Sequence, residues 1–247
     1  MSLHSVKALE NFTVMASDGD VGAIDEVFFD DEKWAVRYLV ADTGDWLSKR
    51  EVLISPISIR TIDWKRRSVL AELTRQQVRD SPGIDTDQPV SRQHEAEINR
   101  HYGYPYYWAG PYMWGDSVFP GVVEESMADK EKLNQADERA EHEPGDPHLR
   151  SSKEVFGYAI RTTDDSVGHV EDFLFDEEDW SIQYMVVDPR NWWPGRHVLI
   201  SPQRIDQMSW DERAVVVGIS REELEHSPQY DPRNPPPGAS RRPEMRR

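Results

Sequence analysis

The fold is decided by one stretch of the chain, residues 18–42, which reads DGDVGAIDEVFFDDEKWAVRYLVAD. A second stretch, residues 164–188, reads DDSVGHVEDFLFDEEDWSIQYMVVD and keeps the glycine, the Phe-Asp pair, the tryptophan and the tyrosine at the same places. The offset between the two stretches is constant, as Gly22 and Gly168 show (168 − 22 = 146). The chain therefore contains one module twice.

The duplication continues past this stretch. The pentapeptide VLISP occurs at 52–56 and again at 198–202, and the register holds without a gap from about 18–82 against 164–228. Solenoid units recur every roughly 20 to 50 residues, in three copies or more, to build a stable array. Two long copies instead indicate a duplicated small domain, and roughly 75 to 80 residues suffice for one compact core. We call the two copies repeat 1 and repeat 2.

Each repeat shows the pattern of short β-strands. Residues 21–29 and 34–41 of repeat 1 are rich in aromatic and β-branched side chains, which are enriched in strands. Alternation along the second of these segments predicts that Trp34, Val36 and Tyr38 share one face of a strand. Further strands are expected in repeat 1, with counterparts in repeat 2, at 12–17, 50–55, 59–64 and 69–73.

Two local signals complete the module. Gly22 and Gly168 fall early in a strand, where a glycine indicates a bend or a bulge. Thr74 and Ser220 each precede a Gln or Glu by three residues, which is the capping-box signature of a helix N-terminus. About six short strands followed by a short helix predict a small, closed or nearly closed β-barrel in each repeat.

The composition divides the chain into four parts. The first barrel is expected at 5–82 and the second at 152–228, joined by a linker at 83–151. The last part, 229–247, is rich in Pro and Arg and is predicted to be a disordered tail. The predicted fold class is therefore mainly β, with two small barrels in tandem that each carry a short C-terminal helix.

The linker contains three distinct segments. Residues 94–101 are predicted to be helical, and the strongly charged residues 124–143 are predicted to form a solvated helix or a disordered stretch. Between them, 101–115 reads HYGYPYYWAGPYMWG, which has the period of neither a strand nor a helix. So much aromatic area would be costly in water. This segment is therefore expected to pack on one or both barrels, or on a partner that recognises Pro and aromatic residues.

The composition also restricts the class of function. A net charge of −17 repels phosphate, so nucleic-acid binding is not expected. With 37% hydrophobic and 30% charged residues, and no apolar run near the roughly 20 residues needed to cross a bilayer, a soluble protein is predicted. The lack of Cys fits a reducing compartment and excludes thiolate metal sites. Because the N-terminus shows no signal-peptide pattern, a cytoplasmic location is expected.

The repeated pattern resembles the PRC-barrel family. Its elements are Asp-Gly or Asp-Asp before Val-Gly, a Phe-Asp pair with an acidic turn, Trp-x-hydrophobic-x-Tyr, and Arg-x-VLISP at 50–56 and 196–202. The family is named for the cytoplasmic domain of the H subunit of purple-bacterial photosynthetic reaction centres, and it includes a barrel domain of a ribosome-maturation factor. The resemblance covers both repeats but neither the linker nor the tail, and it implies a barrel used for interactions.

Neither catalysis, nor a cofactor, nor a metal site is expected. The block Gly115-Asp116-Ser117-Val118 is similar to the nucleophile block of one esterase class, but no His has the partner Asp three residues before it. The acidic turns at 30–33 and 176–179 lack the spaced ligands and central glycine of a calcium loop, so solvated hairpin turns are expected there. The His residues lack the i, i+4 spacing of a metal-binding helix face.

Aromatic side chains outside the strands are the candidates for binding a protein partner. Trp46 of repeat 1, and Trp192 with Trp193 of repeat 2, lie in polar loops. Each either anchors a partner or folds back over the mouth of its barrel. The linker supplies six further candidates, namely Tyr104, Tyr106, Tyr107, Trp108, Tyr112 and Trp114.

Three functions are compatible with these observations. The first is a non-enzymatic adaptor whose barrels bind an unidentified protein or a second copy of the chain. The second is a small-molecule-binding protein or an enzyme with a site between the barrels. The third rests on family resemblance alone and is a role like that of the reaction-centre H subunit, through contact with a membrane complex in photosynthetic electron transfer. We expect the first function, with no enzymatic activity and no cofactor.

Overall fold

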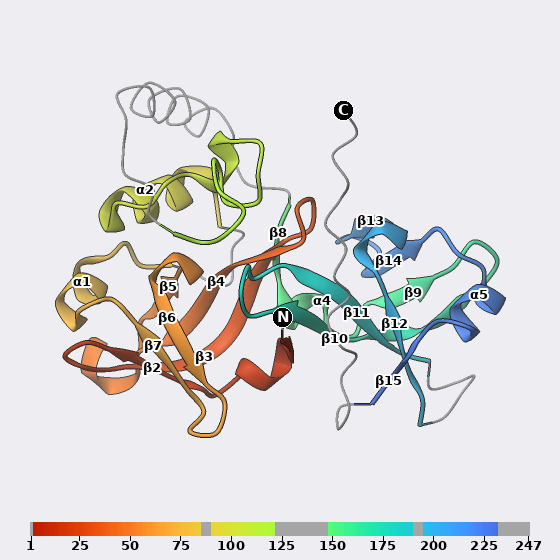
Figure 1. The fold of residues 1–247 in the computed structure, drawn as a ribbon, viewed down its shortest axis with the longest axis horizontal. Coiled ribbons are helices and arrows are strands. Elements are labelled where there is room, and N and C mark those ends of the chain that lie inside the picture. The colour runs from red at the N-terminus through yellow and green to blue at the C-terminus, as the bar shows by residue number, and fades with distance from the viewer. Residues whose placement is uncertain (1, 85–89, 122–147, 190–194, 232–247) are drawn as a thin grey trace. The chain divides into compact units, whose positions relative to one another are not determined.

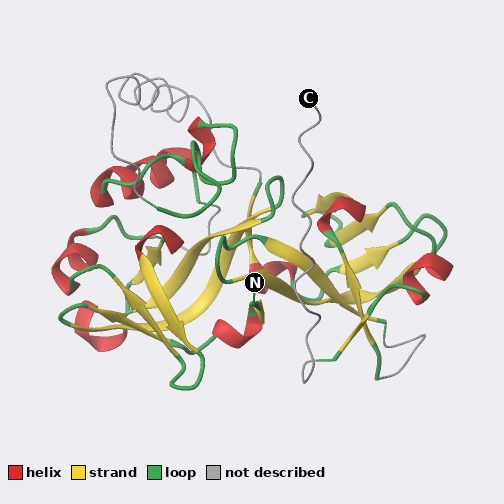
Figure 2. Cartoon of the chain, viewed as in Figure 1, coloured by secondary structure: helices red, strands yellow, loops and turns green. Residues whose placement is uncertain are grey.

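A computed structural model shows a fold built mainly from β-strands (Figures 1 and 2). The residues that it describes are 2–84, 90–121, 148–189 and 195–231.

The chain forms two compact units, and their boundaries do not coincide with those of the repeats. One unit is Leu9–Lys153, which contains most of repeat 1 and the linker. The other combines Glu154–Arg247 with Met1–Ala8, so the first residues of the chain belong to the unit of repeat 2. The predicted boundaries at 82 and 152 follow the sequence repeat, whereas the units follow strand pairing.

The sheet of repeat 1 has the strand order β5-β4-β3-β2-β7-β6, and β8 pairs with β3 beside β2. Neighbouring strands are antiparallel, except that β2 and β7 run parallel. Within the described residues this path does not close into a ring, so the sheet is an open version of the predicted barrel. Its strands are β2 (Thr13–Ala16), β3 (Gly19–Asp30), β4 (Ala35–Asp42), β5 (Glu51–Ile54), β6 (Ile59–Asp63), β7 (Ser68–Ala71) and β8 (Leu149–Ser151).

The sheet of repeat 2 repeats this order as β12-β11-β10-β9-β14-β13, with β1 paired to β10 and β15 added beside β12. The parallel pair recurs between β9 and β14. The predicted mainly-β class, with the same arrangement of strands built twice, is confirmed. The strands are β1 (Leu3–Ser5), β9 (Ala159–Arg161), β10 (Ser166–Asp176), β11 (Ile182–Asp188), β12 (His197–Ile200), β13 (Ile205–Ser209), β14 (Ala214–Val217) and β15 (Gln229–Tyr230).

The predicted helices form at their capping signals. Helices α1 (Arg75–Asp80) and α5 (Arg221–Glu225) each begin with the capping box expected from Thr74 and Ser220. Helix α2 (Arg92–Tyr102) covers the predicted helix of the linker. Short helical turns occupy η1 (Lys7–Leu9), η2 (Gly44–Leu47), η3 (Pro56–Ser58), η4 (Tyr107–Ala109), α4 (Ser152–Val155) and η5 (Pro202–Arg204).

Other segments differ from the expectation or lie beyond the description. Gln229 and Tyr230 pair with β12, so the part expected to be a disordered tail begins with a strand. The charged stretch 124–143 lies outside the described residues. None of the helices in the described parts of the chain combines the length and the apolar character needed to cross a bilayer.

The glycines that the two repeats share, Gly22 and Gly168, lie where two strands approach closely. A Cβ atom on Gly22 would lie 2.0 Å from the carbonyl oxygen of Asp42, and one on Gly168 would lie 2.1 Å from that of Asp188. The pairing register also shifts beside both glycines. The predicted bulge is therefore confirmed, and the glycine is required because any side chain would clash with backbone.

The prediction that Trp34 shares a strand face with Val36 and Tyr38 is wrong. Trp34 lies in the turn before β4 with φ +53°, and Trp180 has φ +62° at the equivalent place. A left-handed residue closes the hairpin between β3 and β4, and the indole then stacks on Phe29 with 6.1 Å between ring centroids. The aromatic and β-branched composition of 34–41 predicted that the strand begins at Trp34, but Trp34 lies in the turn before it.

The acidic turns are less solvated than expected, because their first residues are buried. Asp30 is 4% exposed and Asp176 is 2% exposed. The Oδ1 atom of Asp30 accepts hydrogen bonds from the backbone N–H groups of Glu32 at 2.9 Å and Lys33 at 2.8 Å. These carboxylates satisfy turn amides that have no ladder partner, which is a structural role.

Candidate interaction site

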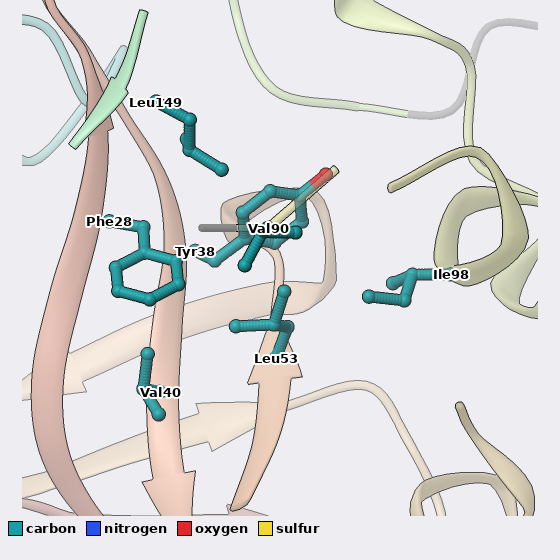
Figure 3. Close-up of a cluster of buried hydrophobic side chains, with 7 residues drawn as sticks. All are labelled: Phe28, Tyr38, Val40, Leu53, Val90, Ile98 and Leu149. Carbon is teal, nitrogen blue, oxygen red and sulfur yellow. The ribbon is translucent and has the colours of Figure 1, made fainter. Parts of the chain in front are cut away.

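The aromatic segment of the linker packs on repeat 1. Helix α2 and the residues after it, 92–117, form what we call the aromatic cap. Ile98 of the cap lies against side chains of β3, β4 and β5 in one buried cluster (Figure 3). The cluster consists of Phe28, Tyr38, Val40, Leu53, Val90, Ile98 and Leu149, with Ile84 and Tyr102 partly buried against it.

Arg37 of β4 fastens the cap to the sheet. Its side chain is fully buried and pairs with Asp30, with 2.7 Å between Nη2 and Oδ2. Its Nη1 atom donates to the carbonyl oxygen of Met113 in the cap at 2.6 Å, and its guanidinium lies 3.8 Å from the ring centroid of Tyr107. Lys33 donates to the carbonyl oxygen of Tyr112 at 3.0 Å. Two cations of repeat 1 thus hold backbone and ring atoms of the cap.

A second polar cluster ties the helix of the cap to its aromatic part. Glu95 is fully buried and accepts a hydrogen bond from the Tyr107 hydroxyl at 2.9 Å. Arg92 donates to the same hydroxyl at 2.9 Å and pairs with Glu95 at 3.2 Å. Burial and the negative charge of Glu95 raise the pKa of Tyr107 well above its usual range, so the hydroxyl stays a donor. The buried charges are therefore paired, as burial requires.

Most of the predicted aromatic contact residues in the linker are covered by their own chain. Tyr104, Tyr106, Tyr107 and Trp114 are buried. Trp108 is half-buried and stacks on Tyr106 with 4.8 Å between ring centroids. Tyr112 alone of these six rings is an exposed residue, at 50%. Packing on a barrel, one of the two expected arrangements, therefore accounts for the segment, and the buried rings contact no partner unless the cap moves.

Among the loop tryptophans, Trp46 folds back onto repeat 1. Its Nε1 atom donates to the carbonyl oxygen of Val21, and the guanidinium of Arg75 lies 4.2 Å from its ring centroid. The side chain is half-buried, so only part of its surface remains for a partner. Trp192 and Trp193 lie outside the described residues, and their predicted role stays a prediction.

The esterase-like block forms a turn of the cap. Gly115 has φ +76°, and the chain pairs with itself between Tyr112 and Gly115 and between Trp114 and Ser117. A Cβ atom on Gly115 would lie 2.9 Å from the carbonyl oxygen of Tyr106, so glycine permits close packing here. This local geometry gives the block Gly115-Asp116-Ser117 a structural role as a turn.

Repeat 2 carries an open pocket of about 260 Å³. Tyr184 of β11 forms part of its wall and is half-exposed, whereas the equivalent Tyr38 of repeat 1 is 1% exposed. Apolar side chains and a polar rim surround the space. Tyr184, Leu199 and Ile219 contribute apolar surface to the lining, which we call the wall. Arg204, Glu223 and Ser227 contribute polar side chains to it, which we call the rim.

In repeat 1 the aromatic cap covers the equivalent positions. Arg204 and Ser227 correspond to Ser58 and Ser81 (204 − 58 = 227 − 81 = 146). The hydroxyl of Tyr104 bonds to the Ser58 side chain, and burial raises its pKa to about 12. Tyr102 lies beside Ser81 and stacks on Tyr104 with 5.4 Å between ring centroids. Two tyrosine rings of the chain itself thus contact the positions that border the pocket in repeat 2.

The third rim residue also corresponds to a residue of repeat 1 that the cap contacts. Glu223 corresponds to Gln77 (223 − 77 = 146), and the ring Nε2 of His101 lies 2.8 Å from the carbonyl oxygen of Gln77. His101, Tyr102 and Tyr104 are consecutive side chains around the end of α2, where Gly103 adopts φ +71°. The end of one helix and the turn after it therefore deliver all three contacts.

The sequence of repeat 1 provides cations that bind the cap, and the matched positions of repeat 2 do not. The positions of Arg37 and Lys33, whose side chains bind the cap, are occupied by Gln183 and Asp179 in repeat 2 (183 − 37 = 179 − 33 = 146). Repeat 2 therefore lacks the paired cations that bind Met113 and its neighbours. Sequence reasoning missed this site, although the unequal residues at two otherwise matched positions were its visible signal.

A further group of potential metal ligands lies on β10 and β11. His169 is paired in register with Asp188, and its Nε2 lies 3.6 Å from Glu171 and 4.0 Å from Asp188. The ammonium of Lys7 pairs with Glu171 at 2.8 Å, so a cation already neutralises one carboxylate. Ion pairing accounts for the group, and we assign no metal to it.

Comparison with known proteins agrees with this geometry. The family model described as PRC-barrel domain matches residues 1–77 and 147–224. A comparison with curated proteins found no match. The two matched segments begin 146 positions apart (147 − 1 = 146), as in the sequence repeat, and end within the helices α1 and α5. Together they cover more than half of the chain, which therefore belongs to the PRC-barrel family and carries its domain twice.

Proposed function

We propose that this protein is a non-enzymatic adaptor, and that repeat 2 binds a partner protein through the pocket beside Tyr184. The proposal rests on one observation, which is that matched residues of the two repeats have different neighbours. In repeat 1 they contact Tyr102 and Tyr104 of the chain's own cap, and in repeat 2 they border an open pocket. The expected occupant is a segment that presents aromatic side chains at the end of a helix.

The size of the pocket favours a side chain over a cofactor. A volume of about 260 Å³ lies below the roughly 300 to 1,000 Å³ of typical small-molecule sites. A single aromatic ring buries much apolar area and still offers a hydroxyl to the rim. Arg204 stands where Ser58 contacts Tyr104 in repeat 1, so the rim of repeat 2 supplies a charged donor for that hydroxyl or for a carboxylate.

The absence of enzymatic activity is part of the proposal. The carboxylate at the rim, Glu223, accepts a hydrogen bond from the backbone N–H of Ser220 at 2.8 Å as part of a capping box. This bond lowers the pKa of Glu223, which is the wrong direction for a general acid or base at neutral pH. Its position is therefore explained by helix capping.

Affinity purification with matched variants tests the proposal. The bait is the full-length chain, either unchanged or carrying Tyr184→Ala with Arg204→Glu. The control variant is Arg60→Glu, which changes a charge at an exposed position of repeat 1. We expect a partner that the unchanged chain and the control retain and that the pocket variant loses. A partner held equally by all three baits, or by none, would contradict this site.

A further inference from the structure

The short strands at the start of the two matched segments, β1 and β8, are exchanged: each completes the sheet of the other repeat. β1 pairs with β10, in the register Leu3 with Asp176 and Ser5 with Leu174. β8 pairs with β3, in the register Leu149 with Asp30 and Ser151 with Phe28. Both partners of each pair are displaced by 146 positions, so the two pairings are the same contact made twice with the strands exchanged.

Side chains repeat the exchange in detail. The hydroxyl of Ser5 donates to Asp172, and that of Ser151 donates to Glu26 at the equivalent place. Asp172 is also 6% exposed and bonds to the backbone N–H of Lys7 at 3.1 Å. A buried carboxylate in each acceptor strand therefore binds the serine of the donor strand.

Two sets of contacts between basic side chains and carboxylates follow the same symmetry. Lys7 pairs with Glu171 at 2.8 Å, and Lys153 pairs with Asp25 at 2.6 Å. His4 lies 3.1 Å from Glu177, while Arg150 lies 2.6 Å from Asp31. The donors share the pattern Leu-basic-Ser-x-Lys, and each acceptor edge offers acidic groups at the matching places. Either donor therefore meets the same chemistry on either edge.

The chain length also permits each donor to pair with its own repeat. On the edge of β3 that faces away from β4, Phe28 pairs with Ser151 of β8 and Ala23 pairs with Thr13 of β2. If β1 took the place of β8, Ser5 would lie opposite Phe28, and residues 6–12 would span the positions between Phe28 and Ala23. That stretch contains more residues than it has to cover, so no stretching is required.

We propose that the edges of β3 and β10 are interchangeable strand-acceptor sites, and that a second copy of this chain can supply the donor strand. Addition of a strand to an open sheet edge is a general mode of recognition, since the backbone ladder supplies affinity and the side chains set the register. Exchange of an identical element between copies is likewise a low-cost route to a dimer. The partner is a second molecule whose Leu3–Ser5 strand occupies β10.

Cysteine pairs in the full-length chain test this proposal cleanly, because the sequence contains no Cys. The first variant carries Ser5→Cys with Asp172→Cys and reports the exchanged pairing. The second carries Ser5→Cys with Glu26→Cys and reports pairing within repeat 1. The control carries Ser5→Cys with Lys65→Cys, at an exposed turn distant in sequence from either edge.

Each variant is unfolded, refolded at low or high protein concentration, oxidised and separated on a non-reducing gel. We expect the first variant to form an intramolecular disulfide at low concentration and an increasing fraction of disulfide-linked dimer at high concentration. If the donor in the same chain acts at an effective concentration of about 1 mM, then about 0.1 mM protein diverts roughly a tenth of the chains into dimers. The control should form neither product.

Two results would overturn the proposal. One is a first variant that stays monomeric at every concentration, and the other is a second variant that links more completely than the first, since β1 would then pair with its own repeat. A further variant, Ser151→Cys with Glu26→Cys, repeats the test independently on the other edge. Its linked dimer fraction should rise with concentration in the same way.

Discussion

At the scale of single residues, Arg37 decides whether repeat 1 holds its cap. The guanidinium of this fully buried side chain joins Asp30, the carbonyl oxygen of Met113 and the ring of Tyr107. Its counterpart in repeat 2, Gln183, carries no charge. The two cations that contact the cap, Arg37 and Lys33, thus have no cationic counterpart at the matched positions of repeat 2.

Replacement of Arg37 by Gln, the residue of repeat 2, should loosen the cap. The change leaves Asp30 as a buried carboxylate without its cation, a loss that costs roughly 3–5 kcal/mol. We expect a lower free energy of unfolding in urea, and faster proteolysis within residues 92–117. The control Arg60→Gln lies in repeat 1 with an exposed side chain and should change neither. If the Arg37→Gln variant were as stable as the unchanged chain and resisted proteolysis equally well, Arg37 would not be the residue that holds the cap.

The buried Asp172 makes stability depend on pH. Burial raises the pKa of its carboxyl from 3.8 to about 6, although Ser5 and Lys7 donate to it. The folded chain therefore binds a proton more tightly than the unfolded chain between these values, and stability falls as pH rises through this window. A shift of this size corresponds to a loss of about 3 kcal/mol above pH 6.

Asp172→Asn should remove this component. Urea unfolding at about pH 4 and about pH 7.5, on either side of the window, compares the variant with the unchanged chain. We expect the difference between the two proteins to move in favour of the variant at the higher pH. Glu212→Gln, at a half-exposed carboxylate, serves as the control and should show no such trend. An Asn variant with the pH dependence of the unchanged chain would show that Asp172 is not the group responsible.

At the scale of elements, the strand glycines set the spacing between β3 and β4. Gly22→Ala places a Cβ atom 2.0 Å from the carbonyl oxygen of Asp42, so the strands must separate. We expect a loss of about 3 kcal/mol, the upper part of the range for overpacking. Gly44→Ala is the matched control, since its Cβ meets nothing within 4 Å and only its φ of +60° is unfavourable. It should lose about 1 kcal/mol in the same urea titration. Equal losses would contradict a backbone clash.

Elements with local signals were predictable from the sequence. The capping boxes at Thr74 and Ser220, the bulge glycine Gly22 and the strands flanking it depend on neighbouring residues. The prediction for Trp34 was wrong because aromatic residues are enriched in strands, whereas the backbone conformation of Trp34 is set by the hairpin turn. Local preference is overridden wherever tertiary structure demands another conformation.

Elements that depend on distant partners were not predictable. The Leu-x-Ser-x-Lys pattern at 3–7 recurs at 149–153, and this offset was a visible signal for β1 and β8. The pattern does not identify the acceptor, because both edges present the same acidic groups. The site of the cap likewise depends on Arg37 meeting residues near Met113, which no local pattern brings together.

At the scale of the whole molecule, the net charge of −17 opposes folding through repulsion among carboxylates. Salt screens this repulsion, and the screening length falls to about 10 Å at 0.1 M ionic strength. We therefore expect the melting temperature to rise between low salt and roughly 0.2 M sodium chloride, with a similar rise in potassium chloride. A melting temperature that falls with salt in calorimetry would mean that attractive ion pairs, such as Lys7 with Glu171, outweigh the repulsion.

The exchanged strands also determine the order in which the strand pairings can form during translation. A ribosome releases the chain from its N-terminus, so Leu3–Ser5 emerges long before its acceptor β10 is synthesised. Repeat 1, in turn, waits for Leu149–Ser151 before its own sheet has every strand. The sheet of repeat 1 therefore stays incomplete until Leu149–Ser151 has been synthesised, and Leu3–Ser5 stays without its partner until β10 has been synthesised.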